Sequence, residues 1–154
     1  MQTFLPYADF KKCADVLDNK RLNKQHVECF QIIKTLETNS KSWRQHPITR
    51  MWENNIDALK EYANCIKIEC LNRNFKSEKI PFYTLPNEII YPKWLGWKLV
   101  HISHQSNLMR KNASYYSQFG WKEYDITGYY WAVTPKTKQA QKVNEQWVNL
   151  FTNK

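Results

Sequence analysis

Apolar residues recur at steps of three and four along most of the chain, which is the spacing of side chains on one face of an α-helix. The clearest case lies within residues 55–72, where Ile56, Leu59 and Ile66 fall on one side. Asp18 stands where its carboxylate can cap the helix that follows it. The pattern predicts five helices, over residues 8–17, 18–36, 55–72, 96–112 and 136–151.

The segments between these helices lack that spacing. Residues 43–52 contain His46-Pro47 and are predicted to form a turn that leads into a helical turn. The proline-rich stretch 75–94 is predicted to be an irregular loop. The one strand candidate, residues 129–134, has no partner strand. We therefore predict an all-α protein, a single compact domain of about five helices over residues 1–154, with a C-terminal helix in residues 136–154.

Charge and aromatic content add a functional class to this fold. Lysine and arginine number 23 against 14 acidic residues, which gives a net charge of +9. Such an excess indicates an anionic partner, most commonly nucleic acid, although solubility alone is an alternative explanation. Aromatic residues make up 15 % of the chain, and rings among basic residues suit base stacking beside phosphate contacts.

Other classes are disfavoured. The start of the chain lacks a signal-peptide pattern, and no apolar stretch reaches the length of a membrane helix. The cysteines form no Cys-x-x-Cys pair and lie at apolar helical positions, as is typical of reduced core thiols in an intracellular protein; they are Cys13, Cys29, Cys65 and Cys70. A zinc site is a weaker alternative because the cysteine spacing is poor; its ligands would be Cys65, Cys70, His101 and His104.

The most informative stretch is the first half of the helix predicted over 18–36. Asp18, Arg21, Gln25 and Glu28 share one face of this helix, and the same face continues with apolar Ile32. A polar stripe that runs into an apolar one borders the core, where polar groups need partners or a task. Either the stripe is an ion-pair ladder between helices, or it is the floor of a site where an arginine grips a phosphate and a carboxylate transfers a proton.

Further candidates for substrate or DNA binding are basic, polar or aromatic residues in or near the predicted helices. Most of them, taken singly, are as readily explained as surface or core residues. They are Lys24, Gln25, His26, Arg44, His46, Trp52, His104, Gln105, Arg110, Lys111, Tyr115 and Tyr116.

Several of these residues also carry a family resemblance. The stretches that do so are residues 1–7, 16–28, 43–52 and 103–116, with a weaker local match over 68–75. Through them the chain resembles the pyrimidine-dimer DNA glycosylase (phage endonuclease V-like) family, and it looks closer to the small bacterial and phage members than to endonuclease V itself. The resemblance implies a single layer of helices without a sheet, an endonuclease V-like fold.

The resemblance also implies a mechanism. In this family the N-terminal α-amine attacks the sugar C1′ and forms a Schiff base, assisted by a glutamate of the long N-terminal helix. Here residue 2 is glutamine, too large for the usual removal of the initiator, so the amine would belong to Met1. The family's glutamate position falls at Leu22 or Asn23, so a carboxylate must come from Glu28 or Asp18.

We therefore expect Met1, Arg21, Glu28 and Asp18 to form the catalytic group, with Met1, Arg21 and Glu28 meeting in one pocket. The predicted function is a DNA glycosylase, with or without AP lyase activity, acting in DNA repair on a damaged or modified base in duplex DNA. We expect a monomer without cofactor or metal, without membrane contact, in the cytoplasm of a bacterium or virus-infected host cell. Two alternatives remain: a nucleobase- or nucleotide-modifying enzyme of the same fold, and a non-catalytic nucleic-acid-binding module.

Overall fold

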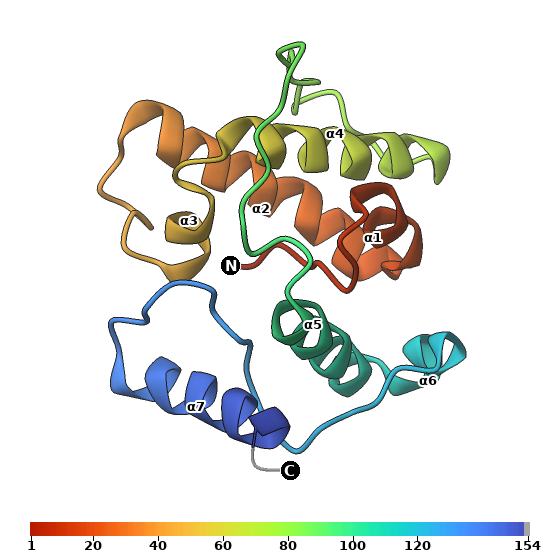
Figure 1. Cartoon of the computed structure of the whole chain (residues 1–154). Helices are drawn as coiled ribbons and strands as arrows, with labels where there is room; N and C mark the ends of the chain where they lie inside the picture. The colour runs from red at the N-terminus through yellow and green to blue at the C-terminus, as the bar shows by residue number, and fades with distance from the viewer. Residues whose placement is uncertain (153–154) are drawn as a thin grey trace. The chain divides into compact units, whose positions relative to one another are not determined.

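The computed structural model describes residues 1–152, and all regular structure within them is helical (Figure 1). Capping contacts begin several of the helices; the Asp18 carboxylate, for example, accepts a hydrogen bond of 2.8 Å from the backbone amide of Arg21. The elements are α1 (Phe10–Val16), α2 (Asn19–Thr38), α3 (Pro47–Trp52), α4 (Ile56–Asn72), α5 (Lys98–Lys111), α6 (Ala113–Tyr116), the short 3-10 helix η1 (Ser117–Phe119) and α7 (Lys138–Thr152).

The predicted all-α class is confirmed for the described residues, and each of the five predicted helices is present with ends shifted by at most two residues. The predicted count of five is wrong, because α3 and α6 are additional short helices. Both are too short to show a repeating apolar face. The proline-rich stretch is irregular, as expected, and residues 129–134 form no strand.

The chain divides into two compact units, each described by itself. Unit 1 comprises Met1–Phe4 and Asp9–Lys93, and unit 2 comprises Leu5–Ala8 and the chain from Trp94 onward. The single-domain organisation stays a prediction.

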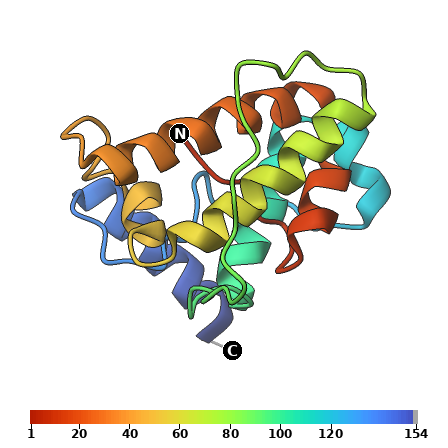
Figure 2. The same cartoon turned by 90° about the horizontal axis from the view of Figure 1, so that it is seen from above.

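The core of unit 1 forms where α2 and α1 pack against α4 (Figure 2). Leu22 and Ile32 of α2 and Leu59 and Ile66 of α4 are fully buried there. These are positions that the three-and-four spacing of the sequence assigns to one helix face. The long helix α2 thereby gains one buried side and one side that can carry function.

Unit 2 is built on α5, α7 and the irregular segment between them. Val143 and Trp147 of α7 are buried with Ile126, and the rings of Tyr124 and Phe151 pack beside them. Polar side chains of α5 bind the backbone of the irregular segment, as the following contacts show. Ser106 Oγ accepts from Tyr124 N at 2.8 Å, Ser103 Oγ accepts from Tyr130 N at 3.1 Å, and Asn107 contacts both backbone groups of Gly128. These side chains supply the backbone hydrogen bonds that a partner strand would supply in a sheet. This explains why residues 129–134 form no strand.

The four cysteines are free thiols, and Cys13, Cys29 and Cys70 are buried as predicted. Cys65 is half-buried, and burial raises the pKa of its thiol to about 11. Within residues 1–152, no helix combines the length and the apolarity needed to cross a membrane.

Candidate active site

The first residues of the chain enter the core of unit 1. Gln2, Thr3 and Phe4 are buried although they belong to no helix. An irregular segment in a core needs partners for its backbone groups. The Gln25 side chain supplies two of them: its Oε1 accepts from Phe4 N at 2.5 Å, and its Nε2 donates to Gln2 O at 2.8 Å. Gln25 therefore binds this segment much as a neighbouring strand would.

Two more buried side chains fix the same segment. Tyr62 of α4 donates its hydroxyl to Phe4 O at 2.6 Å, and Trp52 of α3 donates its indole N–H to Thr3 Oγ1 at 3.1 Å. Three helices thus bind residues 2–4. The α-amine of the preceding residue is held to a defined position as a result.

That position is next to Glu28. The Met1 nitrogen lies 3.7 Å from Glu28 Oε1, while Glu28 Oε2 accepts from Gln2 N at 3.3 Å. The Glu28 side chain is only 10 % exposed. Lys24, one turn earlier on α2, places its ammonium 3.8 Å from Glu28 Oε1 and leaves 63 % of its side chain exposed. The site therefore joins an amine, a nearly buried carboxylate and a lysine that reaches solvent.

His46 lies close enough to this site for the charge of the N-terminal amine to affect its pKa. It caps α3, where its Nδ1 accepts from Ile48 N at 3.2 Å. Burial lowers the pKa of His46, and the positive charge of the N-terminal amine lowers it further. A neutral imidazole is therefore favoured there near neutral pH. Arg44, in the same loop, lies 3.9 Å from Glu53 across an ion pair.

Arg21 and Asp18 occupy the other end of the polar stripe. Besides capping α2, Asp18 places its Oδ2 3.1 Å from Arg21 Nη1. Arg21 and Glu28 are seven residues apart, which is about 10 Å along a helix axis. The structure brings Met1 and Glu28 together, whereas the Arg21 guanidinium is held by Asp18 at the other end of the stripe.

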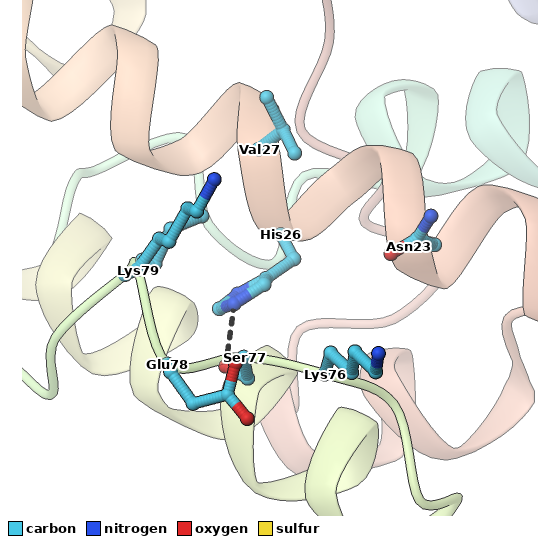
Figure 3. Close-up of a pocket in the computed structure, with 8 residues that line it drawn as sticks. Asn23, His26, Val27, Lys76, Ser77, Glu78 and Lys79 are labelled. Atoms are coloured by element: carbon cyan, nitrogen blue, oxygen red, sulfur yellow. Dashed lines mark hydrogen bonds between the residues drawn. The ribbon is translucent and has the colours of Figure 1, made fainter.

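His26 faces another part of unit 1. At 100° per residue it points about 160° away from Glu28 around α2. Its Nε2 lies 2.7 Å from Ser77 Oγ, and buried Lys67 donates to the backbone carbonyls of Ser77 and Ile80. Burial and then the charge of Lys67 lower the pKa of His26. A pocket of about 400 Å³ opens there (Figure 3), lined by Asn23, His26, Val27, Lys76, Ser77, Glu78, Lys79 and Ile80.

In unit 2, the predicted residues of α5 are engaged in packing and hydrogen bonds. His104 is buried against the ring of Tyr129, and burial followed by the charge of His101 lowers its pKa to about 3. Gln105 donates to Pro6 O at 2.7 Å. Arg110 pairs with Glu123 at 3.2 Å and donates to Tyr124 O at 2.6 Å. Lys111, at the end of the helix, is exposed.

The aromatic run after α5 is a packed cluster. Tyr116 is fully buried and stacks on Trp121 with ring centroids 5.5 Å apart, whereas Tyr115 is only half-buried. A buried ring cannot offer its face to a base, and buried polar groups with protein partners cannot contact a phosphate. The structure therefore corrects the interpretation of five predicted residues as direct DNA contacts; they are Gln25, His26, Trp52, His104 and Tyr116.

Thr3, Tyr62 and Ser77 were not singled out from the sequence. Each is a small or aromatic residue whose role depends on a partner 49 or more positions away, at Trp52, Phe4 and His26 respectively. No local spacing signals such pairs. As for metals, nowhere in residues 1–152 do three or more His, Cys, Asp or Glu side chains gather closely enough to hold an ion.

Comparison with known proteins gives one match. A family model described as pyrimidine dimer DNA glycosylase matches residues 1–80, just over half of the 154-residue chain. The matched range contains Met1, Lys24, Glu28 and His46, so it covers the whole amine site. Neither a curated protein nor a solved structure matches the chain.

Proposed function

Because the chain belongs to the pyrimidine dimer DNA glycosylase family, we propose that it is a DNA glycosylase with AP lyase activity, in which the α-amine of Met1 is the nucleophile. The observation that carries this proposal is the distance of 3.7 Å between the Met1 nitrogen and the nearly buried carboxylate of Glu28. The proposed substrate is a damaged or modified base in duplex DNA. The proposed fold is that of the endonuclease V-like members of the family.

The chemistry needs a nucleophile and a proton acceptor, and the site offers both. The neutral amine attacks the sugar C1′, the bond from C1′ to the base breaks, and the base leaves with the bonding electrons and takes a proton from water. The nitrogen, positively charged after the attack, gives up a proton to the Glu28 carboxylate. As the sugar ring opens, Glu28 passes that proton to the ring oxygen, nitrogen and C1′ are left joined as a protonated Schiff base, and Glu28 is again a carboxylate.

The lyase step follows from the Schiff base. Glu28, as a general base, takes a proton from the sugar C2′, and the bond to the 3′ phosphate breaks by elimination. Lys24 is placed to hold a phosphate beside this carboxylate, because its ammonium lies 3.8 Å from Glu28 and most of its side chain is exposed. These steps need only an amine, a carboxylate and positive charge, so the proposed enzyme needs no cofactor or metal. We propose also that it acts as a monomer.

The test is borohydride trapping of the Schiff base on two duplexes, one with a thymine dimer and one with an abasic site. We expect the wild-type protein to be trapped on both duplexes. Glu28→Gln should lower the trapping rate by about 10²- to 10⁴-fold, which is the usual contribution of a proton-transfer group, while DNA affinity stays within a few-fold. A matched control is Glu37→Gln on the same helix, because Glu37 is more exposed and pairs with Lys60 instead of the amine.

A variant with an extended N-terminus tests the nucleophile itself. Residues added before Met1 convert the amine into an amide and should abolish trapping. Undiminished trapping by the extended protein would show that an amine other than that of Met1 can act as the nucleophile, and it would overturn the proposed role of Met1. Absence of trapping by the wild-type protein on both duplexes would overturn the lyase chemistry.

A further inference from the structure

Trp43 is the most unusual residue near the amine site. It lies in the turn between α2 and α3, its side chain is 53 % exposed, and its backbone φ is +62°. That left-handed conformation is strained for a bulky residue, and an exposed indole recovers little of the cost by burial. Backbone strain of this kind persists where the surrounding structure enforces it, and it concentrates at ligand-binding positions.

The indole borders a pocket on the side of α2 that carries Glu28. The pocket has a volume of about 200 Å³, and its other lining residues come from the end of α2 and the turn after it: Gln31, Lys34, Thr35, Thr38 and Ser40. Gln31 and Thr35 follow Glu28 at three and seven residues, so they continue its helix face. The Trp43 ring also meets the His46 ring edge to face, with centroids 5.8 Å apart. The pocket thus begins one turn beyond Glu28, toward the C-terminal end of α2, and Trp43 links it to His46.

The lining has the chemistry that recognises a nucleobase. An indole face can stack on any base, the amide of Gln31 can bond to the edge of a base, and Lys34 can meet a phosphate. The pocket at His26 lacks an aromatic wall and lies on the opposite side of α2 from Glu28. We propose that a nucleobase displaced from the duplex stacks on Trp43 in this pocket while its sugar faces the Met1 amine. This inference rests on the proposed function.

The experiment compares two duplexes that differ at one site only, a thymine dimer in one and a tetrahydrofuran abasic analogue in the other. Both are measured by equilibrium binding with wild-type protein and Trp43→Ala. Stacking on a ring is lost with the ring, so affinity for the dimer duplex should fall by about 5- to 150-fold. Affinity for the abasic duplex should fall much less, because there is no base to stack. Trp43→Phe should restore most of the dimer affinity.

Two controls separate the ring from the backbone and from surface aromatics in general. Trp43→Gly removes both the ring and the φ strain, so it should bind like Trp43→Ala and unfold at an equal or higher temperature. Phe82→Ala removes a ring of similar exposure that packs over Lys67, near the His26 pocket, and it should leave the ratio of the two affinities unchanged.

Equal losses on both duplexes, or no loss on either, would overturn the stacking role. The stacking role would also be overturned if the wild-type protein is trapped on abasic DNA but binds the dimer duplex no more tightly than the abasic duplex. This outcome would leave the lyase proposal standing. A wild-type protein that binds neither duplex and is never trapped would overturn the proposed function as well.

Discussion

Gln25 shows how one side chain can place the amine on which the proposed chemistry depends. Its amide pairs with the backbone at Gln2 and Phe4, and so it sets how far the chain end extends along α2. Glu28 lies three residues further on the same helix. By fixing the backbone at Gln2 and Phe4, Gln25 therefore determines the distance between the Met1 nitrogen and the Glu28 carboxylate.

Gln25→Leu keeps the approximate shape of this side chain and removes its hydrogen bonds. The buried amide of Phe4 and the carbonyl of Gln2 then lose their partner, at about 1–3 kcal/mol for each unsatisfied group. We expect a lower free energy of unfolding in urea, and a trapping rate that falls further than DNA affinity because the amine is no longer held at Glu28. A Gln25→Leu protein that is folded and trapped at the wild-type rate would contradict this positioning role.

The matched control is Gln118→Leu. Gln118 is exposed, and its amide donates to one backbone carbonyl, that of Tyr115. Surface changes of this kind usually alter stability by less than about 0.5 kcal/mol. The difference between the two variants therefore isolates the buried amide.

At this scale the sequence indicated which residues share a helix face, but not what each of them binds. Periodicity placed Glu28 on the border of the core, where the structure has it. It could not show that Arg21 would turn back to Asp18, because both an ion pair and a phosphate satisfy a guanidinium. Nor could it reveal the partners of Met1, because these depend on where residues 1–4 enter unit 1.

At the scale of elements, long amphipathic helices were predictable and short ones were not. Helices α2 and α4 each repeat an apolar face over several turns, whereas α3 and α6 span six and four residues. The short helices begin through local contacts instead: His46 caps α3, and the Asn112 side chain accepts from Tyr115 N at the start of α6. Residues 129–134 have the composition of a strand, but α5 side chains already bind the neighbouring backbone.

Gly128, in this irregular segment, packs against Val143 of α7. Its φ is +123°, and a Cβ built there would lie 3.1 Å from Val143 Cγ1. Gly128→Ala adds backbone strain and a close contact at once, so we expect it to lower the free energy of unfolding by about 2–3 kcal/mol. Gly120→Ala is the matched control, because φ is +70° there and open space surrounds the position, so its cost should be about 1 kcal/mol. Equal costs in urea unfolding would contradict the role given to Val143.

At the scale of the whole molecule, all four histidines have a lowered pKa, for which burial is the first cause in each case. A histidine with a lower pKa in the folded state binds fewer protons there than in the unfolded state. The contribution of such a histidine to the free energy of unfolding is therefore fully present above pH 6.5, the ordinary histidine pKa, and it is lost as the pH falls below that value. His104 contributes most, because its pKa of about 3 keeps it neutral across the whole window.

The expected outcome is a free energy of unfolding that falls between pH 6.5 and pH 5, by about 1 kcal/mol per pH unit from His104 alone. Urea unfolding at a series of pH values measures this slope. The glutamine of His104→Gln does not titrate in the folded or the unfolded state. The variant should therefore flatten the dependence of the free energy of unfolding on pH, whatever its effect on stability at pH 7. An unchanged slope in that variant would show that His104 is not the main source.

The net charge of +9 predicts that DNA affinity depends strongly on salt, because each phosphate neutralised by the protein releases counterions. Four of the predicted basic contacts are already paired with acidic partners: Arg21 with Asp18, Lys24 with Glu28, Arg44 with Glu53 and Arg110 with Glu123. Exposed lysines such as Lys24 and Lys111 can exchange partners more readily, since an exposed ion pair is worth at most about 1 kcal/mol. We therefore expect the lysines to provide much of the salt dependence.

For duplex DNA without a lesion, log K against log salt concentration should have a slope of about −3 to −6, which corresponds to a few phosphate contacts. Lys24→Ala should make this slope about 0.9 less steep, because Lys24 reaches solvent beside the site where the sugar is proposed to bind. Lys11→Ala is the comparison, because Lys11 is also exposed but sits on α1, paired with Asp15 at 2.9 Å, and should leave the slope unchanged. Titrations at four or more salt concentrations give the slopes. A flat dependence in the wild-type protein would exclude nucleic acid as the partner of this basic protein, and with it the assignment of Lys24 to a phosphate.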